Sequence, residues 1–161
     1  MKIQIRRAER SGDTSSSGLW TVLTSGLFAR RWLGRTAPRV PTLLLPSGRH
    51  TLLYFRTRGC TVCDLIDMKV AAACSQEGVE LMIIDRYAKS DNPKDKEIYT
   101  QPGNVLDVGG AINTAYQVGV YPSLILIDRS GHIVMKDVGT QAAPEQFDSY
   151  LRTQFGALLT G

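Results

Sequence analysis

The chain has 161 residues, of which 43% are hydrophobic and 21% are charged, with a formal net charge of +4. This length fits one domain of ordinary size plus an extension, and three cysteines are too few for a disulfide framework. Residues 1–58 hold eleven Lys or Arg and two acidic residues, whereas residues 59–161 hold eight and thirteen, so the basic excess lies in the N-terminal part.

Residues 1–39 are predicted to be a basic N-terminal extension. Residues 1–18 are basic and then rich in Ser and Gly, which indicates a flexible arm. The basic residues show no recognition motif for nucleic acid, so we expect no nucleic-acid partner.

Residues 19–33 contain an apolar run, Leu19 to Ala29, followed by two arginines. Eleven residues are fewer than the about 20 that a membrane-spanning helix needs. One interpretation is a degenerate membrane anchor or signal segment that lies at a membrane surface. Its aromatic residues would then sit at the lipid boundary: Trp20, Phe28 and Trp32. The other interpretation is a partly ordered cytosolic extension.

Residues 40–161 are predicted to form the compact domain. A strand over Thr42–Leu45, a Pro-Ser-Gly turn and a second strand over Thr51–Phe55 open it. A helix follows to about Glu77, where Gly78 is a stop signal. The nearly continuous apolar run Val79–Asp85 predicts an inner strand, which a right-handed crossover would place parallel to the strand before the helix.

The predicted helix begins with two cysteines at Cys-x-x-Cys spacing, Cys60 and Cys63. Unpaired N–H groups and the helix dipole favour a thiolate at Cys60, and Arg56 and Arg58 are candidates to add positive charge there. Cys63 would turn toward the apolar side of the helix and act as the shielded resolving thiol. The residues that define this apolar side are Val62, Leu65, Ile66, Val70, Ala73 and Cys74.

Three interpretations of the cysteine pair are open: a redox dithiol, half of a zinc site, and two unreactive buried thiols. The zinc site has few further ligands to draw on, namely Cys74, His50 and His132. Cys74 itself is predicted to be an inert core thiol.

The rest of the chain predicts a polar insertion, a helix, a hairpin and a final helix. Residues 86–104 are polar, with at most a short helix. Gly110–Gln117 is a predicted helix, and two strands flank a turn at Asp128–Gly131. The last helix spans Pro144–Phe155, with Pro144 suited to its first turn.

The order of these elements resembles the thioredoxin fold, and in particular the TlpA-like thiol-disulfide oxidoreductases with their MauD group of accessory proteins for methylamine dehydrogenase maturation. The resemblance covers about residues 40–156. Three segments carry it: Gly59-Cys60-Thr61-Val62-Cys63, Ala115 to Pro122, and Leu126 to Ile133.

The resemblance implies an α/β, thioredoxin-like three-layer fold: a central mixed sheet with helices on both faces, and a C-terminal β-hairpin plus helix. It implies that Cys60 is the nucleophile and Cys63 the resolving cysteine. Pro122 matches the family's cis-proline, and Tyr121 before it would hold an extended substrate by backbone bonding. The substrate would also meet the surface around the first sulfur, namely Gly59, Thr61 and Val62.

The sequence departs from the family pattern at three positions. Gly59 stands where many thioredoxins have Trp, and Tyr54 stands where they have a buried Asp that serves proton transfer to the resolving thiol. The proton relay is therefore missing or has moved. Leu53 replaces the Pro of a peroxiredoxin motif, which argues against peroxidase activity.

The sequence therefore predicts a thiol-disulfide oxidoreductase that acts on protein substrates, with no cofactor and no metal. Its expected partners are proteins with disulfides or thiols, an upstream electron donor or acceptor protein, and a membrane surface through residues 19–33. The expected location is periplasmic, or membrane-associated and facing an extracytoplasmic space, with the cytoplasm as the alternative. Two other functions stay open: a non-catalytic partner-docking or maturation factor, and metal delivery through the two thiolates.

Overall fold

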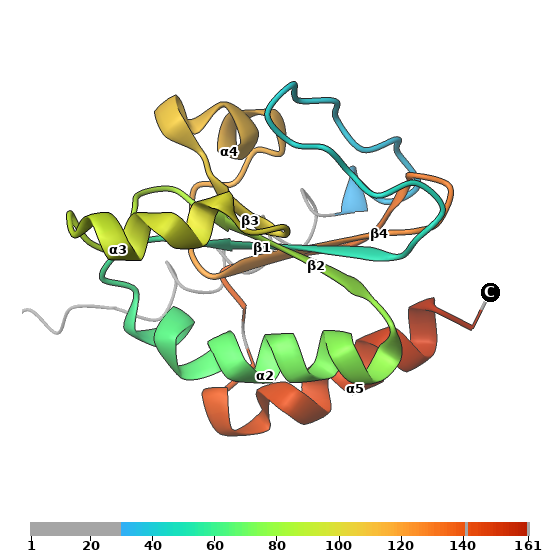
Figure 1. Ribbon diagram of the computed structural model, residues 1–161. Coiled ribbons are helices and arrows are strands. Elements are labelled where there is room, and N and C mark those ends of the chain that lie inside the picture. The colour runs from blue at the N-terminus through green and yellow to red at the C-terminus, as the bar shows by residue number, and fades with distance from the viewer. Residues whose placement is uncertain (1–29, 141, 161) are drawn as a thin grey trace, which may run out of the picture.

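The computed structural model describes residues 30–140 and 142–160. Its strands form one five-stranded sheet in the order β3-β2-β1-β4-β5 (Figure 1). The strand bounds are β1 Thr51–Arg56, β2 Glu80–Asp85, β3 Asn104–Leu106, β4 Ser123–Ile127 and β5 Ile133–Val138. β1 pairs parallel with β2 and antiparallel with β4, so the sheet is mixed.

Helices cover both faces of this sheet. The helix bounds are α2 Thr61–Glu77, α3 Pro93–Lys96, α4 Ala111–Ala115 and α5 Phe147–Leu158, with 3-10 turns η1 Glu97–Thr100, η2 Val108–Gly110 and η3 Pro144–Gln146. Figure 1 shows α2 and α5 below the sheet and α4 above it, beside the loop that precedes β1. This arrangement confirms the predicted three-layer fold with its C-terminal hairpin and helix.

β1 is the centre of the core because both of its faces are covered. All six of its residues are buried. Leu52 and Tyr54 pack in the cluster between the sheet and helices α2 and α5, whereas Leu53 and Phe55 pack in the cluster on the opposite face. This alternation follows from the two-residue period of a strand. The C-terminal end of β1 is therefore a rigid base for the cysteine-bearing turn.

The predicted strand over Thr42–Leu45 is wrong. These residues form a loop with an isolated bridge between Val40 and Leu43, and Leu44 is 82% exposed. Both hydrogen-bonding edges of β1 are already taken, by β2 on one side and β4 on the other. Leu43 is buried even so, because the loop folds over the sheet face.

The predicted insertion contains more structure than expected. Besides α3 and η1 it ends in β3, which pairs parallel with β2 from Asn104 to Leu106. The apolar pattern of three residues was too short to predict a strand, and pairing with the edge of β2 supplies its hydrogen bonds.

Helix α2 buries a narrower side than its periodicity suggested. Cys63, Ile66, Val70, Ala73 and Cys74 are buried as expected. Leu65, by contrast, is 57% exposed and Val62 is 39% exposed. Together with the exposed Met68, they occupy a face of the helix that points to solvent.

The packed domain includes residues that precede the predicted boundary between residues 39 and 40. The backbone of Gly34 and Ala37 donates to Ile133 and Gly131, and Ala37 is part of the core. Trp32, expected at a lipid boundary, packs against the core and lies 4.0 Å from the Lys136 ammonium. Trp20 and Phe28 lie outside the described residues. Within the described part of the chain, no helix has the length and apolarity needed to span a membrane.

Candidate active site

The two cysteines of the Cys-x-x-Cys motif form a disulfide at the start of α2. The sulfur atoms are 2.11 Å apart and the Cα atoms 5.2 Å apart. Cys60 is the N-cap residue of the helix, and its Sγ accepts a hydrogen bond from the Cys63 N–H at 3.2 Å. The same N–H would stabilise a thiolate on Cys60 after reduction, together with the positive end of the helix dipole.

The two cysteine residues differ in exposure. Cys63 is completely buried, whereas Cys60 is partly exposed. Gly59 precedes them with a φ of 73°, a conformation that favours glycine, and this turn carries the chain from β1 into α2. Thr61 and Val62 are exposed next to Cys60. An external thiol or disulfide therefore reaches Cys60 first.

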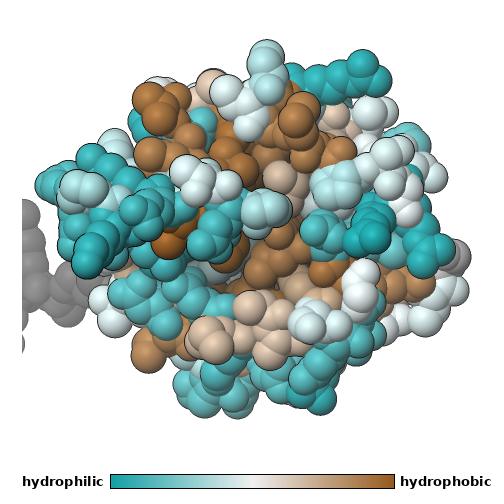
Figure 2. Space-filling view, in the orientation of Figure 1, coloured by the Kyte–Doolittle hydropathy of each residue, from teal (hydrophilic) through white to brown (hydrophobic). Residues whose placement is uncertain are grey.

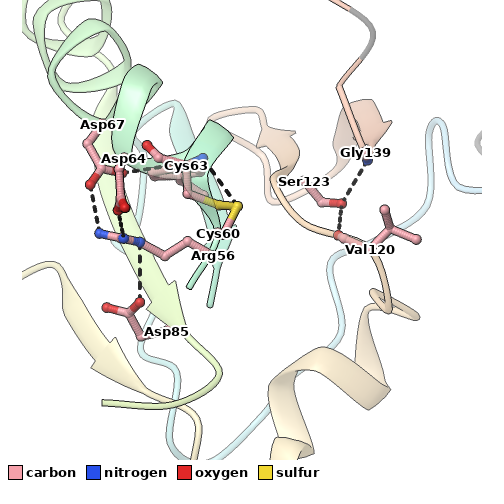
Figure 3. The surroundings of a disulfide bond; sticks show 10 residues. Arg56, Cys60, Cys63, Asp64, Asp67, Asp85, Val120, Ser123 and Gly139 are labelled. Atoms are coloured by element: carbon pink, nitrogen blue, oxygen red, sulfur yellow. Dashed lines mark hydrogen bonds and ion pairs between the residues drawn. A yellow bond between two sulfur atoms is a disulfide. The ribbon is translucent and has the colours of Figure 1, made fainter. Parts of the chain in front are cut away.

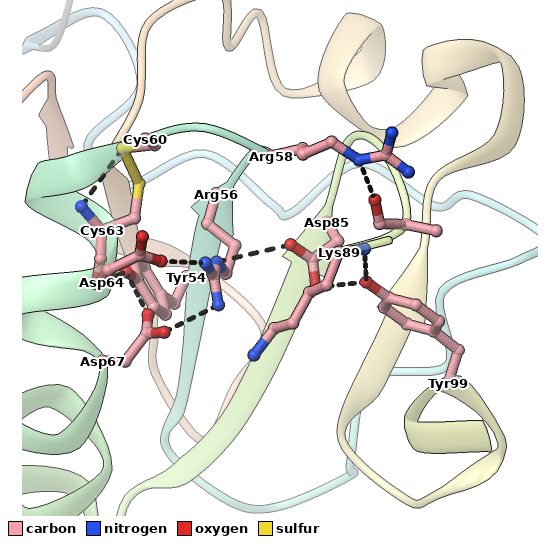
Figure 4. A network of polar contacts seen from close by, with 11 residues as sticks. Tyr54, Arg56, Arg58, Cys60, Cys63, Asp64, Asp67, Asp85, Lys89 and Tyr99 are labelled. Atoms are coloured by element: carbon pink, nitrogen blue, oxygen red, sulfur yellow. Dashed lines mark hydrogen bonds and ion pairs between the residues drawn. A yellow bond between two sulfur atoms is a disulfide. The ribbon is translucent and has the colours of Figure 1, made fainter. Parts of the chain in front are cut away.

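A cluster of ionised groups lies beside the disulfide, centred on the Arg56 guanidinium (Figures 3 and 4). Arg56 contacts Asp64 Oδ1 at 2.9 Å, Asp67 Oδ2 at 2.7 Å and Asp85 Oδ1 at 3.4 Å. The Arg56 side chain is only 5% exposed. Because Asp64 and Asp67 belong to α2, this arginine holds the cysteine-bearing turn to the ends of β1 and β2.

Tyr54 occupies the position of the expected buried acid and contacts Cys63 through its hydroxyl. That hydroxyl donates to Asp67 Oδ1 at 2.8 Å and lies 3.2 Å from the Cys63 carbonyl oxygen. Burial raises the pKa of Tyr54 well above its ordinary value, and the Asp67 carboxylate raises it further. The phenol therefore stays protonated as a hydrogen-bond donor.

Asp85 is the deepest carboxylate of the cluster, with a side chain 1% exposed. Burial raises its pKa, while Arg56 and the Tyr99 hydroxyl oppose that shift. Tyr99 belongs to η1 and donates to Asp85 Oδ2 at 3.0 Å. The insertion is thereby connected to the cluster under the disulfide.

Arg58 extends away from the disulfide (Figure 4). Its Nε donates to the Ala88 carbonyl at 2.7 Å, and its Nη2 lies 3.2 Å from Asp91 Oδ1. Both predicted pKa-tuning arginines thus have partners other than the sulfurs. Their effect on the Cys60 thiolate stays a prediction.

The Tyr121–Pro122 segment lies at the same end of the sheet as the disulfide. The Tyr121–Pro122 peptide bond is cis. Phe55 pairs with Ser123, so Pro122 lies opposite the end of β1 from which the cysteine turn departs. The Ser123 hydroxyl donates to the Val120 carbonyl and accepts from the Gly139 N–H, which fixes this segment (Figure 3).

Tyr121 turns its side chain toward α4, where its hydroxyl donates to Asn113 Oδ1 at 2.7 Å. Asn113 in turn donates to Asp107 Oδ2 at 2.7 Å. The Tyr121 side chain is thus held by α4, and contact of its backbone with a substrate stays a prediction.

Sequence reasoning missed the carboxylates and the tyrosine that surround Arg56: Asp64, Asp67, Asp85 and Tyr99. The sequence does contain a signal for the pairing of Arg56 with Asp85. Arg56 is the last residue of an otherwise apolar strand, and Asp85 is the last residue of the neighbouring parallel strand. Parallel strands end at the same sheet edge, which places the two side chains together.

Comparison with known proteins gives a curated relative and solved structures with similar folds. No protein-family model matches the chain. It is 29% identical over 114 residues to the methylamine utilization protein MauD of Paracoccus denitrificans. That match covers 69% of this chain and 56% of MauD, so the chain spans about half the length of this curated relative.

Solved structures with similar folds include disulfide oxidoreductases. A putative thiol:disulfide interchange protein DsbE from Chlorobium tepidum has a TM-score of 0.57 at 21% identity, covering 79% of this chain and 97% of that one. A secreted disulfide oxidoreductase of Mycobacterium tuberculosis has a TM-score of 0.50 at 16% identity, covering 66% and 83%. The chain therefore has a thioredoxin-like fold, with a Cys-x-x-Cys disulfide at the start of its first long helix and the Tyr121–Pro122 segment at the same end of the sheet.

Proposed function

We propose that this protein is a thiol-disulfide oxidoreductase that exchanges disulfides with protein substrates. The observation that carries the proposal is the Cys60–Cys63 disulfide at the start of α2, with Cys60 partly exposed and Cys63 buried. The similarity to MauD and to proteins described as disulfide oxidoreductases supports it.

In the reducing direction, the Cys60 thiolate attacks one sulfur of a substrate disulfide. A bond forms between Cys60 Sγ and that sulfur, and the other substrate sulfur leaves as a thiolate that takes up a proton. Cys63, as a thiolate, then attacks Cys60 Sγ, and the second substrate thiol is released. Two electrons pass from the dithiol to the substrate, and a partner dithiol restores the reduced pair. Oxidation of a substrate dithiol runs the same steps in reverse.

The surroundings of the disulfide support distinct roles for the two sulfurs. The Cys63 N–H and the helix dipole stabilise negative charge on Cys60, the sulfur that meets the substrate. We propose that the substrate segment lies along Gly59, Thr61 and Val62 and bonds to the backbone of Tyr121 beside Pro122. The Arg56 cluster would hold α2 in place while the disulfide opens and closes.

The proposed location is an extracytoplasmic space. Of the predicted extension 1–39, Trp32, Gly34 and Ala37 pack on the domain, so the proposed membrane contact is made by the part of residues 19–33 that precedes Trp32. The description of the Mycobacterium tuberculosis relative as secreted supports this location. Cell fractionation of the full chain would test it. Recovery in the extracytoplasmic fraction is expected, and recovery in the cytosolic fraction would contradict it.

Cysteine variants test the activity. Cys60→Ser should abolish reduction of insulin disulfides, and Cys63→Ser should trap a mixed disulfide with the substrate. Cys74→Ser is the matched control, since this thiol is buried in the core, and it should leave turnover unchanged. Unchanged turnover by Cys60→Ser would overturn the proposal.

A docking factor without catalysis is the second candidate, because Tyr54 stands where the family's proton-transferring acid is expected. A redox titration with thiol alkylation separates the two. A couple that titrates between about −120 and −300 mV supports the enzyme. A pair that does not respond to redox buffer supports the docking factor.

A further inference from the structure

A cavity opens between the insertion and the turn that leads from β1 to the cysteines. Its volume is about 580 Å³, and its lining includes Thr57 and Arg58 from the turn and Tyr87 and Lys96 from the insertion, with Leu106 of β3. A second cavity of about 240 Å³ shares Tyr87 and Leu106 with the first. The two cavities therefore meet at the same apolar side chains.

The insertion is fixed relative to the cysteines by direct contacts. Arg58, two residues before Cys60, donates to the Ala88 carbonyl and pairs with Asp91. On the other side, Tyr99 of η1 donates to Asp85, which contacts Arg56. The cavity wall is thus anchored to both the turn and the cluster that holds α2. Arg58, which lines the cavity, precedes Cys60 by two residues in the chain.

The cavity combines exposed apolar groups with a local positive charge. Tyr87 is 56% exposed, and Val108, which lines the second cavity, is 79% exposed. Figure 2 shows hydrophobic residues gathered on the upper part of this face, over α4 and η2. Residues 59–161 hold eight Lys or Arg and thirteen acidic residues. Residues 86–96 account for four of these basic residues but for only two of the acidic ones.

Lys96 carries the charge of the cavity that is available to a ligand. Among the charged residues that line the larger cavity, Arg58 and Asp91 pair with each other at 3.2 Å. Lys96 is exposed, and within the described part of the chain no ion pair engages it. Arg86, at the second cavity, lies over the Tyr87 ring at 4.8 Å. The arrangement thus presents cations and an aromatic ring around an apolar floor.

We propose that this cavity binds a segment of the protein substrate that carries acidic and apolar side chains next to its reactive cysteine. The proposal rests on the proposed function and adds a substrate class to it. The apolar side chains would pack on Tyr87 and Leu106, and a carboxylate would pair with Lys96. The insertion is then a specificity element of the oxidoreductase.

Peptide disulfides of one length test this specificity. The probe is a peptide with one cysteine linked to thionitrobenzoate, flanked either by Asp-Leu-Asp or by Lys-Leu-Lys. The reduced Cys63→Ser protein, which keeps Cys60 as the attacking thiol, releases thionitrobenzoate as the mixed disulfide forms. The second-order rate constant should be about tenfold higher for the acidic peptide at low salt, and this preference should shrink as salt is added.

Lys96→Glu in this background should remove most of that preference. Lys94→Glu is the matched control, because it changes the net charge equally and lies in the same helix, but Lys94 is not part of the cavity lining. Tyr87→Ala should lower the rate constants of both peptides by about fivefold through loss of apolar contact. Hydroxyethyl disulfide, which is small and neutral, should react at one rate with every variant.

The outcomes separate the two proposals. Equal rates for the two peptides, or equal effects of Lys94→Glu and Lys96→Glu, would overturn the assignment of the cavity while Cys60 stays reactive toward hydroxyethyl disulfide. Failure of Cys60 to react with any of the three disulfides would overturn the proposed function itself. A preference that disappears only in Lys96→Glu supports the cavity as the recognition site.

Discussion

Arg56 Nη1 and Asp67 Oδ2 lie 2.7 Å apart, and this pair joins the end of β1 to the helix that carries the disulfide. The same guanidinium reaches Asp64 on that helix and Asp85 at the end of β2. One buried arginine therefore connects three elements at the point where the sulfurs are held. Several measurements can test what this connection contributes.

Replacing Arg56 by Gln should destabilise the protein strongly. The change leaves the buried Asp85 without its cation, and removal of one partner of a buried pair costs about 3–5 kcal/mol. Urea unfolding of the disulfide form measures the free energy of unfolding. Arg58→Gln is the control, since Arg58 and Asp91 are exposed, and it should change that free energy by no more than about 0.5 kcal/mol. Similar losses in the two variants would contradict the role assigned to Arg56.

Removing the Tyr54 hydroxyl should change both stability and redox behaviour. Tyr54→Phe deletes the hydrogen bond to Asp67 and the contact with the Cys63 carbonyl, at a cost of about 1 kcal/mol. Tyr116→Phe is a matched control, because its hydroxyl donates to the Pro38 carbonyl instead. Both variants should lose similar stability, but only Tyr54→Phe should shift the reduction potential of the cysteine pair. An unchanged reduction potential in Tyr54→Phe would show that the Tyr54 hydroxyl does not influence the cysteine pair.

The three thiols of the reduced protein should react in a fixed order with iodoacetamide. Cys60 is partly exposed and should be labelled first, followed by the buried Cys63. Burial raises the pKa of Cys74 to about 12, so this thiol should stay unlabelled at pH 8 until denaturant is added. Mass spectrometry of the labelled peptides gives the order. Labelling of Cys74 at the rate of Cys60 would show that the core is open.

The free energy of unfolding should fall at alkaline pH. Burial raises the pKa of Tyr116 and of Cys74 to about 12, above their ordinary values of 10.0 and 9.0. At a pH between the ordinary and the raised pKa of each group, the folded state keeps a proton that the unfolded chain has released. The free energy of unfolding therefore decreases as pH rises through this interval. Lys136 has the opposite effect, because burial lowers its pKa from 10.5 to about 8. Between these two values it makes the free energy of unfolding increase as pH rises.

Urea unfolding of the disulfide form across pH 8 to about 12 checks this dependence. Cys74→Ala should make the decline shallower above pH 9, the ordinary pKa of the thiol. Tyr116→Phe should do the same above pH 10. A free energy of unfolding that stays constant to the end of this range would contradict the protonated state of both groups.

Substitutions in α2 distinguish its buried side from its exposed side. Ile66→Ala should cost about 2–5 kcal/mol because Ile66 is completely buried. Leu65→Ala should change the free energy of unfolding by about 0.5 kcal/mol or less, since Leu65 is 57% exposed. Equal costs would mean that Leu65 packs as the helical periodicity suggested.

The sequence alone determined the order of the main elements and the position of the cysteine pair. The apolar strand before Gly59, the Cys-x-x-Cys spacing and the three- and four-residue period of α2 are local patterns. Local backbone preferences act within such segments, so the helix, the parallel crossover and the hairpin could be predicted. The burial of Cys63 followed from its place on the apolar side of the helix.

Only the tertiary structure decided which groups surround the disulfide. Arg56, Asp64, Asp67 and Asp85 come from three elements, and their distances depend on the register between strands and on where α2 crosses the sheet. The tertiary structure also decided that Thr42–Leu45 is a loop. A strand there would need a neighbour with unpaired backbone groups, and both edges of β1 are already paired with β2 and β4. Composition and periodicity describe each segment by itself, whereas ion pairs, edges and cavities arise from segments far apart in the chain.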